Sequence, residues 1–135
     1  MAASDLDRRA RKLLRAADIF RVCQYLSLAA GAACTRLIGG GAGTMALFGQ
    51  AVATIVFGWI YSGQTAKLIS ARYPDLDPFR HLWTRTDRYT PLVRAAAVGQ
   101  GDALTPALLD REAPLMFRAF VLVLVMALLE PLFAR

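Results

Sequence analysis

The amino-acid sequence predicts an all-α integral membrane protein with about three transmembrane helices and further amphipathic helices at the membrane surface. Hydrophobic residues make up 56% of the chain and charged residues 19%, against roughly 45–50% and about 25% in soluble domains. The apolar residues gather in three blocks, 19–38, 42–61 and 114–133, each close to the length a helix needs to cross a bilayer. No stretch alternates as a strand does. We therefore expect one membrane domain over residues 1–135.

Residues 4–20 have the pattern of a basic amphipathic helix. Ser4 is a suitable N-cap, and Asp5 and Asp7 follow in the first turn, where negative charge suits the helix dipole. An apolar stripe runs along one face and basic residues lie off it; the stripe consists of Leu6, Leu13, Leu14 and Ala17. Such a helix is suited to lie on a membrane surface. A solvated helix packed on the rest of the protein fits the pattern equally well.

The first block, 19–38, is the weakest spanning candidate and the second, 42–61, the strongest. Arg21 and Arg36 stand near the ends of the first block, whereas the second carries no formal charge and ends in two aromatic residues, Trp59 and Tyr61, which suit the headgroup belt. Small residues in both blocks favour close helix packing with one polar fastening. We predict that this packing surface comprises Gly31, Gly43, Gly49, Gln50 and Ala53.

The glycine-rich run "GGGAGTMALFGQ", residues 39–50, lies between these two blocks. A phosphate-binding P-loop requires G-x-x-x-x-G-K-[ST], and no lysine occurs between Lys12 and Lys67. The dinucleotide fingerprint G-x-G-x-x-G also fails, because the sixth position from Gly39 is Thr44 and no strand precedes it. The run is therefore predicted to be the turn of a helical hairpin.

The third block, 114–133, carries two charged residues. Pro114 suits the first position of a helix and Pro131 its end. Glu130 falls on the same side of the membrane as Arg36 of the first block, so we predict an Arg36–Glu130 ion pair between the two helices. The alternative is that both side chains extend to the lipid headgroups.

The connection 62–113 is predicted to be helical and to lie on the cytoplasmic or matrix side. Asp77 and Pro78 begin a short amphipathic helix that carries Trp83 as an interfacial aromatic residue. A second helix starts with Thr90 as its cap and stops before Gly99, and a third starts from Thr105.

Basic residues predict the orientation. With the N-terminus inside, fourteen of the 16 Lys and Arg residues fall on the inner side and only Arg36 and Arg135 on the outer side, which satisfies the positive-inside rule. This explains the net charge of +6 without nucleic acid as a partner. We expect contacts with phospholipids, anionic ones above all. The residues predicted to make them are Arg21, Trp59, Tyr61, Trp83 and Arg118.

No residue pattern predicts catalysis, a metal or a cofactor. His81 is the only histidine, whereas a metal site normally needs three or four ligands. The G-x-S-x-G nucleophile motif is absent. Acidic residues are missing from the middle of the apolar blocks, which disfavours a proton or ion path.

One short stretch resembles a known family. "RVCQYLS", from Arg21 to Ser27, is similar to the R-x-x-Q-Y stretch near the start of peroxin-11 family proteins. The resemblance covers seven residues and implies a protein that elongates peroxisomal membranes through an amphipathic helix. The short chain and the glycine hairpin depart from that family.

The function expected from the sequence is that of a non-catalytic accessory or assembly subunit of a larger energy-converting membrane complex, respiratory, photosynthetic or ATP synthase. Its partners would be other membrane subunits, and its location the mitochondrial or bacterial inner membrane. Two alternatives stay open. One is a membrane-shaping protein acting through residues 4–20, and the other is a soluble helical interaction module.

Overall fold

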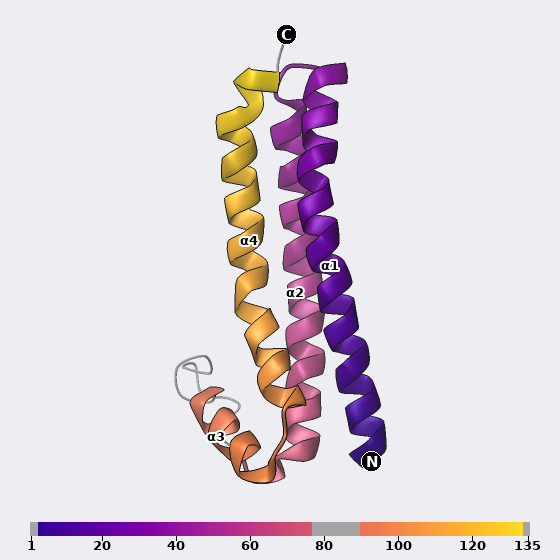
Figure 1. Ribbon diagram of the computed structural model, residues 1–135, viewed down its shortest axis with the longest axis vertical. Helices are drawn as coiled ribbons and strands as arrows, with labels where there is room; N and C mark the ends of the chain where they lie inside the picture. Colours follow the sequence, from indigo (N-terminus) through magenta and orange to yellow (C-terminus); the bar gives the residue numbers. More distant parts are fainter. Residues whose placement is uncertain (1–2, 77–89, 134–135) are drawn as a thin grey trace. The chain divides into compact units, whose positions relative to one another are not determined.

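The computed structural model describes residues 3–76 and 90–133. The described residues are 93% helical and contain no strand. They form three long helices and a short one: α1 (Ala3–Leu37), α2 (Ala42–Arg72), α3 (Thr90–Gln100) and α4 (Leu104–Phe133) (Figure 1). The predicted all-α fold is confirmed.

The chain divides into two compact units. The charged unit comprises the described residues of 1–17 and 60–112, and the apolar unit those of 18–59 and 113–135. Each long helix therefore contributes one part to each unit. The apolar unit holds five described charged residues and the charged unit fifteen; the five are Asp18, Arg21, Arg36, Arg118 and Glu130.

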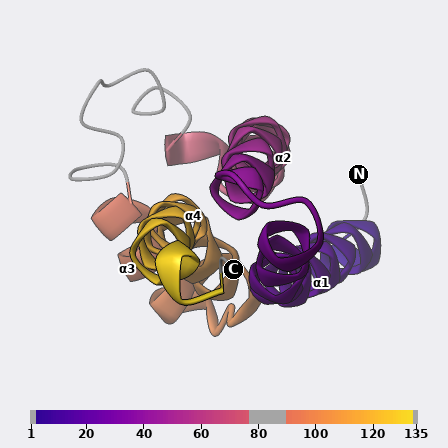
Figure 2. The same ribbon diagram turned by 90° about the horizontal axis from the view of Figure 1, so that it is seen from above.

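The apolar unit is a bundle of three helical segments. Residues 18–37 of α1, 42–59 of α2 and 113–133 of α4 lie side by side, and seen from above their helices form a triangle (Figure 2). Leu47 of α2 meets Leu122 and Met126 of α4 in its core, and Leu28 of α1 packs against them. Each segment is 18 to 21 residues long, or about 27–32 Å at the rise of an α-helix.

The glycine run forms the connection between α1 and α2. Gly39, Gly40 and Gly41 have φ of 81°, 54° and 80°, a left-handed conformation that other residues adopt only at a cost. The amide of Met45 then donates to the carbonyl of Gly41 as α2 begins. The run thus reverses the chain between two antiparallel helices, as its sequence predicts.

The charged unit contains the start of α1, the end of α2, all of α3 and the start of α4. Its core cluster joins α2, α3 and α4 through five buried residues, Ile69, Tyr73, Val93, Ala97 and Leu109. α3 ends at Gln100, two residues later than the predicted end before Gly99, and Gly101 follows it with a φ of 68°. The next amide, of Asp102, donates to the carbonyl of Ala97 at 2.9 Å, as in a Schellman-type helix end.

Two helices are longer than the predicted blocks. The amphipathic segment 4–20 and the first block 19–38 form the single continuous helix α1. The helix predicted from Thr105 and the third block are likewise continuous in α4. Pro114, expected at the first helical position, lies ten residues inside α4, where its missing N–H removes one backbone hydrogen bond. The predicted surface helix around Asp77 and Trp83 lies outside the described residues.

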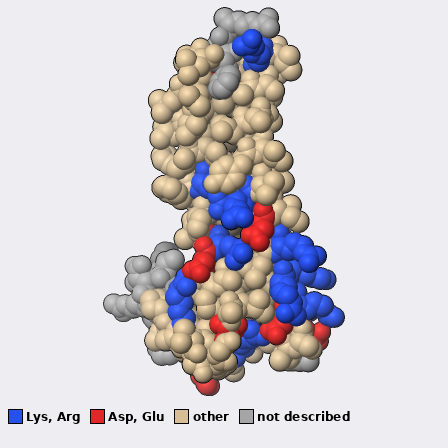
Figure 3. Space-filling view, in the orientation of Figure 1, with Lys and Arg blue, Asp and Glu red and all other residues tan. Residues whose placement is uncertain are grey.

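Side chains at the surface differ sharply between the units. Lys, Arg, Asp and Glu gather over the charged unit, including the start of α1, whereas the apolar unit is almost free of them (Figure 3). Eighteen of the 21 exposed large hydrophobic residues belong to the apolar unit. Two helices of the described chain, α2 and α4, are long and apolar enough to cross a membrane.

Candidate functional site: polar contacts within the apolar unit

A buried glutamine connects all three helices of the apolar unit. Gln24 of α1 has no exposed surface. Its side-chain nitrogen donates to the hydroxyl of Thr54 on α2 at 3.0 Å and to the carbonyl oxygen of Leu115 on α4 at 3.3 Å. Its side-chain oxygen accepts a 2.8 Å hydrogen bond from Arg118 of α4. A buried amide is stable only when its donors and acceptor find such partners.

Arg118 turns toward this network, whereas the sequence predicted that it would extend to the headgroups. Besides its bond to Gln24, its guanidinium lies 5.8 Å from the ring centroid of Tyr25, within the range of a cation–π interaction. Arg118 as a whole is half-buried. The reason for the difference is local, because a glutamine oxygen and an aromatic ring lie within its reach.

Gln50 takes part in the network from within its own helix. Its side-chain nitrogen donates to Thr54 at 3.1 Å, and the Thr54 hydroxyl donates to the backbone carbonyl of Gln50 at 3.0 Å. The bond between helices is made by Thr54 and Gln24. Gln50 therefore orients Thr54, the residue that bonds to α1. The side-chain oxygen of Gln50 is itself buried without a partner among the described residues.

A second polar contact lies near the hairpin turn. The carboxylate of Glu130 on α4 accepts a hydrogen bond from Thr44 at 2.7 Å and one from Thr35 at 3.3 Å. Thr35 belongs to α1 and Thr44 to α2, so this group also joins three helices. The predicted Arg36–Glu130 ion pair is wrong for this structure. Arg36 is exposed, and the Glu130 carboxylate accepts hydrogen bonds from the hydroxyls of Thr35 and Thr44 instead.

Two of the predicted packing residues, Gly31 of α1 and Gly43 of α2, lie where the backbones of these helices come close together. A Cβ atom added to Gly43 would lie 2.5 Å from the carbonyl oxygen of Gly31 and 2.7 Å from the methyl carbon of Met126. Neither separation is tolerated by real side chains, so only glycine fits at this crossing.

Gly49 and Ala53 lie elsewhere. Both are exposed, and a Cβ atom at Gly49 would meet nothing within 4 Å in the described structure. Within this chain the two residues do not pack against another described helix, because they lie on the face of α2 that turns away from α1 and α4. Of the four small residues in the predicted packing surface, two thus lie at the crossing of α1 and α2 and two lie at the surface.

The predicted interfacial residues also separate into two groups. Arg21 is exposed, and Trp59 is 81% exposed, which leaves both accessible to lipid. Tyr61 is only 1% exposed, and its hydroxyl donates to the carbonyl of Leu108 at 2.7 Å inside the charged unit. The prediction of a headgroup contact is therefore wrong for Tyr61. Trp83 lies outside the described residues.

The charged unit has a polar cluster centred on Asp102. This carboxylate accepts bonds from the backbone amides of Leu104 and Thr105 and so caps α4. The hydroxyls of Thr105 and Tyr73 each donate to it at 2.6 Å, and Arg72 lies 3.0 Å away. Arg72 is also paired with Asp7 of α1. One carboxylate thus joins the ends of α2, α3 and α4.

These contacts shift two pKa values in opposite directions. Burial would raise the pKa of Asp102, but the hydrogen bonds from Thr105, Tyr73 and Arg72 outweigh it and lower the pKa to about 2. Burial and the neighbouring carboxylate raise the pKa of Tyr73 to about 12. Both groups keep the protonation state that their mutual hydrogen bond requires at neutral pH.

Sequence reasoning missed the residues that make most of these contacts. Gln24 and Thr54 had a usable signal, since each is a polar residue inside an otherwise apolar block. Thr35 and Thr44 had less, because threonine is common in transmembrane segments and bonds its own helix as readily. Asp102 follows a glycine and precedes a helix, a pattern typical of an N-cap.

The polar contacts described above hold helices in position within each unit. Within residues 3–76 and 90–133, no three His, Cys, Asp or Glu side chains come together in the way a metal ion requires. Compared with protein-family models, curated proteins and solved structures, the chain matches none of them. The seven-residue resemblance to peroxin-11 proteins thus gains no support, and both Gln24 and Tyr25 within it contact Arg118.

Proposed function

We propose that the protein is an integral membrane protein with three spans and that it serves as an accessory or assembly subunit of a larger membrane complex. The observation that carries the membrane assignment is the apolar exterior of the apolar unit. Exposed large hydrophobic residues lie on all three of its segments, for example Leu26 of α1, Ile55 of α2 and Phe120 of α4. In water such a surface would aggregate.

The packing supports the proposal of three spans. Among the helices that the structure describes, α2 and α4 are the two that are apolar enough to qualify by hydropathy. However, α1 contributes residues 18–37 to the same compact unit, and Gln24 and Gly31 of α1 fit against both other helices. If two of these segments cross a bilayer, the third crosses with them. The charged unit is then on the cytoplasmic or matrix side by the positive-inside rule.

The role of a subunit is supported by what the polar contacts do. Gln24, Arg118 and Glu130 bond to other groups of the same bundle and thereby fix helix positions. We propose that the exposed apolar faces meet lipid and neighbouring subunits, with energy-converting complexes of a bacterial or mitochondrial inner membrane as the first candidates. The alternative of a membrane-shaping protein that acts through residues 4–20 is disfavoured. The apolar residues Leu6, Ala10 and Ala17 of this segment are already buried within the protein.

Extraction and co-purification test the proposal. Carbonate extraction should leave the protein in the membrane pellet, and release into the aqueous phase would refute the three-span assignment. A tagged chain extracted in mild detergent should migrate in a large complex with respiratory, photosynthetic or ATP synthase subunits. Recovery as free monomer only, from cells that contain the complexes intact, would refute the subunit role.

Orientation is tested with single cysteines. In a Cys23→Ala/Cys34→Ala background, a membrane-impermeant maleimide should label Ser4→Cys from the inner side only and Arg135→Cys from the outer side only. The same side for both variants would contradict an odd number of spans.

A further inference from the structure

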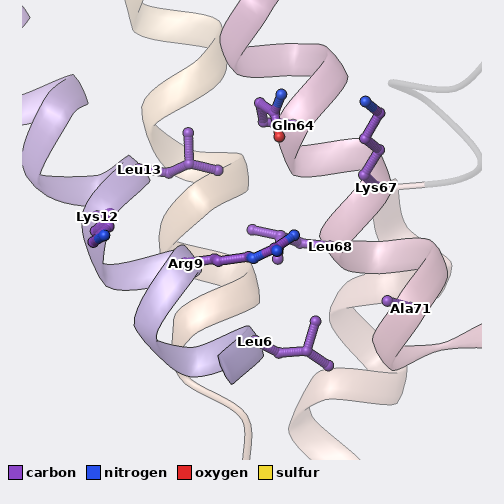
Figure 4. A pocket seen from close by; sticks show the side chains of 8 residues that line it. All are labelled: Leu6, Arg9, Lys12, Leu13, Gln64, Lys67, Leu68 and Ala71. Atoms are coloured by element: carbon purple, nitrogen blue, oxygen red, sulfur yellow. The ribbon is translucent and has the colours of Figure 1, made fainter. Parts of the chain in front are cut away.

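The charged unit contains an open groove that none of the roles above uses. It lies between the first three turns of α1 and the last turns of α2 and has a volume of about 430 Å³, within the range of pockets for small ligands. Its walls combine hydrophobic and basic side chains (Figure 4). Leu6 and Leu13 extend from α1 toward α2, and Leu68 and Ala71 belong to the opposite wall.

Three cations line this groove: Arg9, Lys12 and Lys67. Arg9 extends from α1 across the groove toward Leu68 (Figure 4). None of the three has an ion pair or a hydrogen-bond partner among the described residues. The neighbouring acids of α1 are already engaged, since Asp5 pairs with Arg8 and Asp7 with Arg72.

We propose that the groove binds one anionic phospholipid, with its phosphate among Arg9, Lys12 and Lys67 and the first part of an acyl chain against the leucines. The three unpaired cations provide charge complementarity for a phosphate, which arginine and lysine bind through several N–H donors. The leucines provide an apolar surface beside the phosphate site. An acyl chain can cover this surface, whereas a soluble phosphate compound would leave it uncovered.

The position of the groove along the chain favours a membrane lipid as the occupant. Leu13 precedes the first residue of the apolar unit by five residues, and Gln64, which also lines the groove, follows its last α2 residue by five. Five residues span about 18 Å when fully extended and about 7.5 Å as a helix. A lipid headgroup at the inner surface is therefore within reach of the cations.

This inference rests on the proposed membrane location but needs no partner subunit. If the protein does not bind the lipid, the expected results of the co-purification and carbonate experiments stay the same. If the protein is released by carbonate as a soluble protein, it has no membrane from which to bind a lipid. The two proposals are thus separable by experiment.

The test is lipid binding by the purified full-length chain in mild detergent, followed by native mass spectrometry and by thermal unfolding. Phosphatidylglycerol should add one molecule per chain and raise the midpoint of unfolding, with the logarithm of its concentration once the site is mostly filled. Phosphatidylcholine, which has the same acyl chains and no net charge, should bind at least tenfold more weakly. Inorganic phosphate is the third probe.

A matched pair of triple variants assigns the site. Arg9→Gln/Lys12→Gln/Lys67→Gln should weaken phosphatidylglycerol binding by a factor on the order of 100, given the worth of each cation beside an anionic lipid. Arg8→Gln/Arg11→Gln/Arg15→Gln removes the same charge from the same region outside the groove, and its affinity should fall less than threefold. All six residues are exposed, so both variants should keep the helical content of the unaltered chain.

Three results would overturn the proposal. Equal losses in the two triple variants would show that only net charge attracts the lipid. Equal binding of phosphatidylcholine would exclude recognition of the anionic headgroup. Inorganic phosphate that binds as tightly as phosphatidylglycerol would identify a soluble phosphate as the ligand.

Discussion

The glycine crossing between α1 and α2 allows a sharp test, because the same substitution in the same helix should have opposite effects at two positions. Gly43→Ala places a methyl group 2.5 Å from the carbonyl oxygen of Gly31 and 2.7 Å from Met126, and also against the hydroxyl of Thr35. Gly49→Ala places the same group in open space. Both variants replace a glycine hydrogen by a methyl group within α2.

The expected magnitudes follow from these distances. A backbone oxygen cannot rotate away, so α1 and α2 must separate by nearly 1 Å to restore ordinary contact at Gly43. Overpacking of this kind costs about 1–3 kcal/mol. Alanine favours a helix over glycine by about 0.5–1 kcal/mol, which is the whole effect at Gly49. The free energies of unfolding of the two variants should therefore differ by about 1.5–4 kcal/mol.

Equilibrium unfolding in mixed micelles measures this difference. The purified protein is titrated with a denaturing detergent, and loss of helix is followed by far-ultraviolet circular dichroism for both variants and the unaltered chain. Gly43→Ala should unfold earlier than the unaltered chain and Gly49→Ala at the same point or later. If Gly43→Ala is as stable as Gly49→Ala, the close crossing of α1 and α2 does not exist.

Three further outcomes follow from the polar contacts. Because the pKa of Asp102 is lowered from 3.8 to about 2 in the folded protein, its carboxylate stabilises the fold above pH 4. About 2 kcal/mol of stability should be lost as the pH falls from 4 to 2. Unfolding titrations of an Asp102→Asn variant should lack that loss, and an unchanged pH dependence would contradict the assignment. In a double-mutant cycle, Gln24→Ala and Thr54→Val should show a coupling energy of about 0.6 kcal/mol and at most about 1.7 kcal/mol; additive effects would mean that the two side chains do not interact. Arg36→Ala should change the unfolding free energy by less than about 0.5 kcal/mol. Glu130→Ala should cost about 1–3 kcal/mol because it leaves the hydroxyls of Thr35 and Thr44 without their acceptor, and equal effects of the two substitutions would restore the discarded ion pair.

The sequence allowed the helices to be predicted because their signals are local. Blocks of apolar residues and the glycines at 39–41 locate two helices and the turn between them without any knowledge of packing. The joined helices were not predictable in the same way. Pro114 suggests a helix start because proline lacks a backbone N–H. The structure instead begins α4 at Leu104.

The contacts between helices were predictable only in part, because rotation about a helix axis is not fixed by composition. Gly31 and Gly43 meet, whereas Gly49 and Ala53 face outward, although all four belong to the same kind of small-residue pattern. Glu130 was expected to seek the opposite charge of Arg36. A carboxylate also accepts bonds from hydroxyls, and Thr35 and Thr44 lie beside it while the Arg36 side chain points away.

The contact at Glu130 has a consequence for the order in which the protein is made. Thr35 and Thr44 stand on either side of the first turn, so they come together as soon as the hairpin of α1 and α2 forms, before α4 has been synthesised. In the proposed orientation the C-terminal end of α4 must then carry an acidic side chain through the bilayer. The finished hairpin already holds two hydroxyl donors on the far side, which would retain that end once it has arrived. The position of α4 along its axis would thus be fixed by two helices that are translated before it.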